Sequence, residues 1–243
     1  MFDREQFEKD KRANAASQAA DEALCRLALD FLVQSDRHHY GYQWTWLGLP
    51  IVQMPQDILV TQEIIWETKP DLMIETGIAW GGSIVLYASI LQLIGKGRVI
   101  GIDRVLPDKN RQEIMKYPFS DRISLIEGSS VDPDVVRQVK EQVRPGDSVM
   151  LLLDSNHTHD HVLEELRLYA PLVTPGQFLV VSDTIVEDIP PQSHRPRPWG
   201  PGDNPKTALR AYLDETDCFA EDDYINAKLL LSYSPNGYCR RIR

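Results

Sequence analysis

Residues 71–83 read DLMIETGIAWGGS, an apolar run that ends in an acid and then turns through glycines. This pattern is typical of a buried strand that passes through a tight turn into a helix. Glycines let the backbone approach a ligand closely, and the free amides at a helix start favour negative groups. The spacing of Gly77, Gly81 and Gly82 differs from the GxGxxG dinucleotide fingerprint, and the lysine of a P-loop is missing.

Short apolar runs alternate with helical patterns from this segment to the end of the chain. Strands are expected at 72–74, 98–102, 123–126, 149–153 and 178–181, and helices at 56–68, 83–95, 132–143, 159–170 and 205–215. This alternation predicts an α/β fold with a mostly parallel sheet and helices on both faces, whose strands end at one ligand-binding edge. A closing antiparallel hairpin is expected from residues 229–233 and 238–242 around Pro-Asn-Gly.

Outside this alternating part, three segments have a different character. Residues 3–34 predict a helix, residues 38–55 are rich in aromatic side chains, and residues 185–204 are rich in proline. We therefore expect an N-terminal helix and aromatic segment over 1–55 and a ligand-binding domain over 56–243. The aromatic segment is expected to be a cap, a subunit contact in a homo-oligomer, or a loop that plugs the edge of the core. The proline-rich segment is expected to cover the ligand edge.

The composition limits the classes of partner. A formal net charge of −10 argues against nucleic acid and anionic membranes, and no apolar run is long enough to span a bilayer. Cys25, Cys218 and Cys239 lack metal-site spacing and are expected to be free thiols. The first ten residues are charged and lack the apolar core of a secretory signal. A cytoplasmic protein that acts on a small molecule is the expectation.

A second acid follows the second predicted strand, at Asp103. In doubly wound folds a carboxylate at this position accepts hydrogen bonds from ribose hydroxyls. Together with the glycine turn, Asp103 therefore predicts a cofactor that contains adenosine. The alternative is that the glycines only make tight turns and that Asp103 only caps a helix.

Two further acids end the fourth and fifth predicted strands, at Asp154 and Asp183. Adjacent strands would bring the two carboxylates together, where they repel unless a proton or a cation separates them. A hard divalent ion such as Mg²⁺ would do so, and it would lower the pKa of a substrate hydroxyl. His157, three residues after Asp154, is then the candidate general base; the alternative is a structural histidine.

The neighbouring His159 and His161 raise the possibility of a zinc site. No cysteine is nearby, and alternate residues of an extended segment point in opposite directions, so the zinc site is disfavoured. These two histidines are expected to cap the following helix or to face solvent.

Four segments, residues 74–83, 99–103, 153–157 and 180–184, resemble the cephalosporin hydroxylase family, which includes rhamnosyl O-methyltransferases. The resemblance covers roughly residues 40–243. It implies a class I methyltransferase dependent on S-adenosylmethionine (SAM), with a Rossmann-like, seven-stranded sheet, a Mg²⁺ site and O-methylation of a sugar or natural product. The name of the family comes from a member that acts with a partner enzyme.

The resemblance also assigns roles to residues. The methionine part of SAM would lie among Glu75, Thr76, Gly77, Gly81, Gly82 and Ser83, the ribose at Asp103 and Arg104, and the adenine beside Gly128, Ser129 and Ser130. Metal would be held by Asp154 and Asp183 together with Ser182, with Asp154 also near the cofactor. Family members often carry Glu-Asp where this chain has Ser182-Asp183, so this chain has one carboxylate fewer at that position and a weaker metal site is expected.

The acceptor would be held by residues from the aromatic and proline-rich segments. Composition and position select Tyr40, Tyr42, Trp44, Trp199, Asn204 and Lys206. Two other functions stay open: an oxidoreductase using NAD, which the glycine spacing disfavours, and a non-catalytic SAM-binding partner of another enzyme, which the missing glutamate favours.

Overall fold

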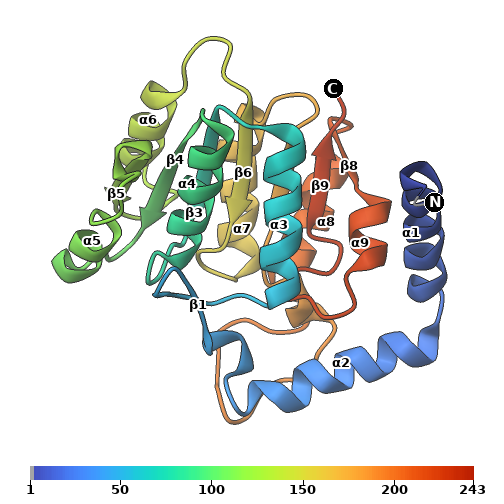
Figure 1. Ribbon diagram of the computed structural model, residues 1–243. Coiled ribbons are helices and arrows are strands. Elements are labelled where there is room, and N and C mark those ends of the chain that lie inside the picture. The colour runs from blue at the N-terminus through green and yellow to red at the C-terminus, as the bar shows by residue number, and fades with distance from the viewer. Residues whose placement is uncertain (1–2) are drawn as a thin grey trace.

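The computed structural model describes residues 3–243, so the expectation about the first ten residues falls partly outside it. Its centre is a seven-stranded sheet in the order β5-β4-β3-β6-β7-β9-β8 (Figure 1). The strands are β3 (Leu72–Thr76), β4 (Arg98–Asp103), β5 (Ile123–Glu127), β6 (Val149–Leu153), β7 (Phe178–Val181), β8 (Phe219–Glu221) and β9 (Tyr238–Arg241). The pairs among β3 to β7 are parallel, and β9 runs antiparallel to β7 and β8. The predicted fold class is confirmed.

Helices cover both faces of the sheet because successive strand side chains point to opposite sides. Met73 packs with the helices on one face, and Leu72 and Ile74 pack with those on the other. Helices α3 and α4 lie in front in Figure 1, and α7 and α8 lie behind. The helices are α1 (Arg4–Ala19), α2 (Glu22–Asp36), α3 (Pro55–Thr68), α4 (Gly82–Ile94), α5 (Asp108–Ile114), α6 (Pro133–Gln142), α7 (His159–Tyr169), α8 (Pro205–Glu215) and α9 (Asp223–Lys228).

The register places the ends of the parallel strands at one level. Thr76 of β3 pairs with Ile102 of β4 and Leu153 of β6. Backbone hydrogen bonds continue for one residue beyond the ends of these strands. The amide of Gly77 donates to Ile102, and that of Asp154 donates to Thr76. The acids that follow these strands therefore meet along one edge.

The N-terminal segment is more regular than expected. The helix expected over 3–34 is two helices, because the side chain of Asp21 caps α2 by accepting from the Leu24 amide. The aromatic segment contains a short hairpin, β1 (Trp44–Trp46) and β2 (Leu49–Ile51), after the 3₁₀ turn η1 (Tyr40–Tyr42). Trp46 donates its indole N–H to Ser89 of α4, so the hairpin packs against the domain.

The antiparallel pair at the C-terminus is present, but its first strand was assigned wrongly. Residues 229–233 form no strand, and β8 is the partner of β9. Asp57 of α3 explains the difference, because its carboxylate accepts from the Ser232 hydroxyl and the Tyr233 amide and draws that segment away from the sheet. The remaining 3₁₀ turns are η2 (Ser120–Arg122), η3 (Ala170–Leu172) and η4 (Thr184–Glu187). Among residues 3–243, no helix combines the length and apolar character needed to cross a membrane.

Candidate active site

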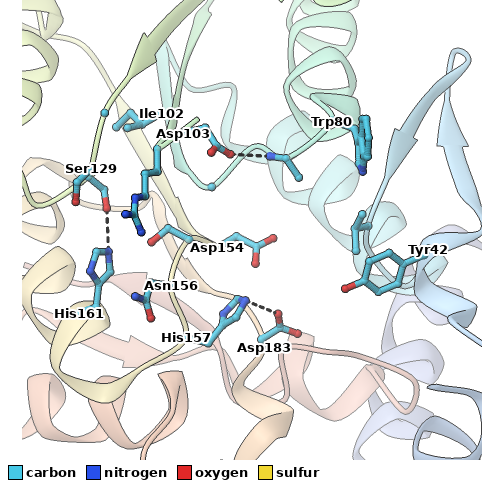
Figure 2. A pocket seen from close by; sticks show the side chains of 17 residues that line it. Tyr42, Trp80, Ile102, Asp103, Ser129, Asp154, Asn156, His157, His161 and Asp183 are labelled. Atoms are coloured by element: carbon cyan, nitrogen blue, oxygen red, sulfur yellow. Dashed lines mark hydrogen bonds and ion pairs between the residues drawn. The ribbon is translucent and has the colours of Figure 1, made fainter. Parts of the chain in front are cut away.

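A cavity of about 650 Å³ opens at the carboxyl edge of the parallel strands (Figure 2). The structure brings together many of the predicted site residues around it, from the ends of five strands and from the aromatic segment. These are Tyr42, Gly77, Asp103, Arg104, Gly128, Ser129, Ser130, Asp154, His157 and Asp183. In Figure 2, Asp103, Ser129 and His161 lie on one side of Asp154, and Tyr42 and Trp80 lie on the other.

Glu75 does not line the cavity, although it was expected beside the cofactor. Its two carboxylate oxygens accept hydrogen bonds from the hydroxyls of Ser83 (2.7 Å) and Tyr87 (2.9 Å) inside the core. Burial raises the pKa of Glu75 to about 8, and the hydrogen bonds and the charge of Asp103 modify that shift. Glu75 therefore joins β3 to α4, while Thr76, Gly81, Gly82 and Ser83 also lie outside the cavity wall.

The glycines of the turn are needed first for packing within the protein. Gly77 has a φ of 80°, and a Cβ atom there would lie 2.0 Å from the backbone oxygen of Asp154. At Gly82 a Cβ atom would lie 2.2 Å from the carbonyl oxygen of Pro50, where β2 approaches the start of α4. These positions admit no side chain, whatever the cavity holds.

Asp103 fixes the same turn from the neighbouring strand. One of its oxygens, Oδ2, accepts from the amides of Ile78 (3.0 Å) and Ala79 (2.9 Å), and Oδ1 accepts from Val105 (3.1 Å). Oδ1 retains a lone pair for a further donor, because each carboxylate oxygen accepts two hydrogen bonds. Asp103 can thus hold the glycine turn and still accept from a ligand hydroxyl at the cavity.

Asp154, His157 and Asp183 form a compact group beside the cavity. One ligand atom from each lies within 4.8 Å of the others, and Nε2 of His157 is 3.2 Å from Oδ2 of Asp183 (Figure 2). Burial and then the nearby charge of Asp183 raise the pKa of Asp154 well above its ordinary value. Asp183 has a φ of 54°, an uncommon conformation for a residue other than glycine.

The two carboxylates of this group fit a divalent cation, and His157 lies beside them. Carboxylate oxygens are the donors that Mg²⁺ and Mn²⁺ accept, and a cation would relieve the repulsion from Asp183 that adds to the effect of burial on the pKa of Asp154. Ser182 is not part of the group; its amide donates to Leu153, and it faces a small neighbouring cavity with Asp57.

Two of the expected acceptor residues lie beside this group. Tyr42 lines the main cavity, and the ring of Trp199 meets that of His157 edge-on, with centroids 4.8 Å apart. A second cavity of about 100 Å³ adjoins the first and shares Tyr42, His157 and Asp183 with it.

The other four acceptor candidates have structural partners instead. Asn204 caps α8 and donates to Glu187, and the ammonium of Lys206 lies 2.6 Å from the carboxylate of Asp188. Tyr40 packs edge-on against Trp44 in the aromatic segment. None of these four side chains lines either cavity.

Several cavity residues were missed in the sequence. They include Ala79, Trp80, Ile102, Ser155, Asn156 and His161. His161, expected to cap or to face solvent, lies in the wall with Nε2 3.1 Å from the Ser130 hydroxyl and 3.6 Å from Glu165. His161 and Glu165 are four residues apart on α7, so they lie on the same face of the helix. This spacing is the signal in the sequence that could have indicated a partner for His161 other than solvent.

Comparison with known families gives one match over most of the chain. The model of the family described as Rhamnosyl O-methyltransferase/CmcI matches residues 38–242. The rhamnosyl O-methyltransferase of Mycobacterium bovis (strain BCG / Pasteur 1173P2) is 32% identical over 241 residues, which cover 90% of this chain and 93% of that protein. The Mycobacterium leprae (strain TN) protein of the same name is 31% identical over 211 residues, covering 84% and 87%.

Solved structures show the same fold at lower identity. An apo structure of CmcI is 20% identical with a TM-score of 0.59, over 83% of this chain and 77% of that one. CmcI with Mg and SAM has 20% identity and a TM-score of 0.57, over 83% and 78%. The O-methyltransferase TomG from Streptomyces achromogenes, in complex with SAM, has 17% identity and a TM-score of 0.53, over 79% and 80%.

Proposed function

The chain belongs to the Rhamnosyl O-methyltransferase/CmcI family, and we propose that it is an O-methyltransferase that uses SAM and a divalent cation to methylate a hydroxyl of a sugar or other natural product. The observation that carries the proposal is the position of Asp154, His157 and Asp183 in the wall of a cavity large enough for a nucleoside cofactor and part of an acceptor. The names of the mycobacterial relatives favour a deoxysugar hydroxyl as the acceptor.

The adenosine end of SAM is placed on the side of Asp103 and Ser129. Asp103 offers a free lone pair to a ribose hydroxyl, and Ile102 adds an apolar contact beside it. The hydroxyls of Ser129 and Ser130, after β5, lie where adenine is expected from the resemblance. When bound, SAM supplies an electrophilic methyl group, and its sulfonium charge is favoured by the surrounding carboxylates.

Asp154, His157 and Asp183 are assigned to the reaction centre. Asp154 and Asp183 would hold Mg²⁺, which when bound lowers the pKa of an acceptor hydroxyl. His157 accepts the proton of that hydroxyl, and the carboxylate of Asp183, 3.2 Å from Nε2, stabilises the imidazolium that forms. Trp199 restricts the His157 ring from one side by its edge-on contact.

Residues 38–55 are proposed to be a cap over the acceptor side. The hairpin packs on α4, and Tyr42 faces the cavity. Both contacts support the role of a cap rather than that of a subunit contact, which was the other expected role. Cys25, Cys218 and Cys239 are free thiols, which supports the proposed cytoplasmic location.

The function is tested by methyl transfer from SAM labelled in its methyl group. The acceptors are methyl α-L-rhamnoside and a panel of glycosides and phenols, with MgCl₂ or MnCl₂ and with chelator as the control. The proposal expects a labelled methyl ether and an equal amount of S-adenosylhomocysteine. If SAM binds but no acceptor of the panel is methylated, the non-catalytic partner becomes the better account; if SAM does not bind, the proposal is wrong.

A further inference from the structure

Asp36 is an unusual residue for its position. It is the last residue of α2, where a negative charge is unfavourable beside the partial negative charge at the carboxyl end of a helix. Its side chain is only 5% exposed, and its two oxygens bind two consecutive residues of a distant loop. Nε2 of His194 lies 2.8 Å from Oδ2, and Nη2 of Arg195 lies 2.7 Å from Oδ1. A buried carboxylate needs such partners, so the interaction is specific to this pair of segments.

The loop that carries His194 and Arg195 has little backbone support. We define the proline-rich loop as residues 188–203, between η4 and the N-cap of α8. Five of its residues are prolines, which have no N–H group to donate. Hydrogen bonds between its own backbone groups join Arg195 to Gln192, and Gly200 to Asp203. Side chains must therefore hold the loop in place.

Both ends of the loop are fixed independently of Asp36. At one end, Asp188 pairs with Lys206 of α8, and at the other, Glu187 accepts from the Gly202 amide and the Asn204 side chain. Near its first end the loop also packs through Ile189 in an apolar cluster with Leu32 of α2. In its middle, at His194 and Arg195, the polar link to α2 is the carboxylate of Asp36.

Arg195 extends the contact to the active site. Its Nη1 donates to the hydroxyl of Tyr42 (2.9 Å), and its guanidinium lies 5.6 Å from the centroid of that ring. Tyr42 is part of the cavity wall (Figure 2). Four residues further along the loop, Trp199 touches His157. One carboxylate thus helps to position Tyr42 and the loop that carries Trp199, and both aromatic side chains line the second cavity.

Residues of this contact network line the second cavity. Its walls include Asp36, Tyr42, His157, Asp183, Arg195 and Trp199. Asp103 and Ser129, where the adenosine end of SAM is proposed to bind, lie on the other side of Asp154 (Figure 2). We propose that Asp36 is a positioning residue that fastens the proline-rich loop over the acceptor side of the site, without contact to the cofactor. The assignment of that side to the acceptor rests on the proposed function.

The first test compares Asp36→Ala with Asp30→Ala in the full chain. Asp30 is an exposed carboxylate on the same helix, so it is the matched control. Hydrogen exchange is measured across residues 188–203 with S-adenosylhomocysteine and MgCl₂ present. We expect exchange in the middle of the loop to be ~10-fold faster in Asp36→Ala and unchanged in Asp30→Ala, because the loop then opens locally. Affinity for S-adenosylhomocysteine stays within about twofold of the wild type, since the cofactor does not touch Asp36.

The second test approaches the contact from the loop. Arg195→Gln replaces a partly exposed residue, so it leaves the core intact even if Asp36→Ala folds poorly. With methyl α-L-rhamnoside as the acceptor, KM is expected to rise ~10-fold in Arg195→Gln and in Asp36→Ala, and no further in the double variant, while kcat changes less.

Hydrogen exchange in the proline-rich loop tests the inference even if no acceptor is methylated. Equal loop exchange in Asp36→Ala and wild type, or a loss of cofactor affinity as large as the effect on KM, would overturn it. Absent methylation with the exchange difference present would count against the proposed function alone.

Discussion

At the end of β3, Glu75 directs its carboxyl group into the core, where it accepts hydrogen bonds from the hydroxyls of Ser83 and Tyr87. The resemblance predicts the same acid beside the cofactor, and its side chain does not line the cavity. The acids at 103, 154 and 183 were placed correctly, because the ends of parallel strands must meet at one edge. Trp80 and His161 could not be placed, because the direction of a side chain next to a turn depends on packing that one sequence does not display.

The raised pKa of Glu75 predicts the pH dependence of stability. With a folded pKa of about 8 against an ordinary value of 4.5, the carboxyl group of Glu75 holds a proton in the folded state that it has lost in the unfolded state between these pH values. The wild type therefore loses stability as pH rises from about 4.5 to about 8. Glu75→Gln keeps a neutral side chain, so it should gain roughly 2–4 kcal/mol relative to wild type between these limits.

Urea unfolding of both proteins at pH 5 and pH 8.5 measures this difference. Shifts from other groups, including Asp57 with its pKa raised to about 6, are common to both proteins and cancel. A stability difference that does not change with pH would show that Glu75 is ionised in the fold.

Asp154→Asn tests the metal group. Removing one of two carboxylates should weaken the binding of Mg²⁺ or Mn²⁺ by at least ~100-fold, as titration calorimetry would show. The same change should stabilise the metal-free protein, because it replaces a carboxyl group whose ionised form is disfavoured by burial and by the charge of Asp183. Asp30→Asn, at an exposed position of α2, is the control and should change neither property. Metal binding that survives Asp154→Asn would contradict the assignment.

At the scale of elements, the sequence predicts what has a regular period and misses what depends on distant contacts. From α3 to α8, the observed ends of the strands and helices lie within a few residues of the predicted ends, because each element has a clear apolar pattern or a capping residue. The exception is α5, which was not predicted. The segment 229–233 has a strand-like pattern, but the hydrogen bonds of its last two residues to Asp57 prevent pairing. The long N-terminal helix is interrupted where the Asp21 side chain caps α2.

The contact between β2 and α4 gives a prediction for Gly82. In Gly82→Ala the new Cβ atom would lie 2.2 Å from the Pro50 carbonyl oxygen, a backbone atom that cannot move aside. We expect a loss of ~2 kcal/mol or more, which lowers the Tm by roughly 4 °C or more in a chain of this size. Gly200→Ala is the matched control, because a Cβ atom there meets nothing within 4 Å. Thermal unfolding compares them; equal Tm values would mean that the hairpin does not pack on α4 as described.

At the scale of the whole molecule, the N-terminal segment and the domain behave as one catalytic unit. The expected boundary at residue 55 separates a cap from a ligand-binding domain, yet the cavity wall includes Tyr42 from the first part and Asp154 from the second. Asp36 and Arg195 join the two parts by an ion pair whose carboxylate is buried. In the proposed function the carboxyl edge of the sheet holds the cofactor, and the segments outside the alternating pattern hold the acceptor. Those segments have no regular period, which is why the sequence specifies the acceptor least.

Calorimetric titration of the purified chain with SAM, with and without MgCl₂, tests the central claim most directly. The account predicts a Kd on the order of micromolar for wild type, a loss of at least ~10-fold in Asp103→Ala, and no change in Asp30→Ala. Failure to bind SAM under either condition, above all with binding of NAD instead, would contradict it.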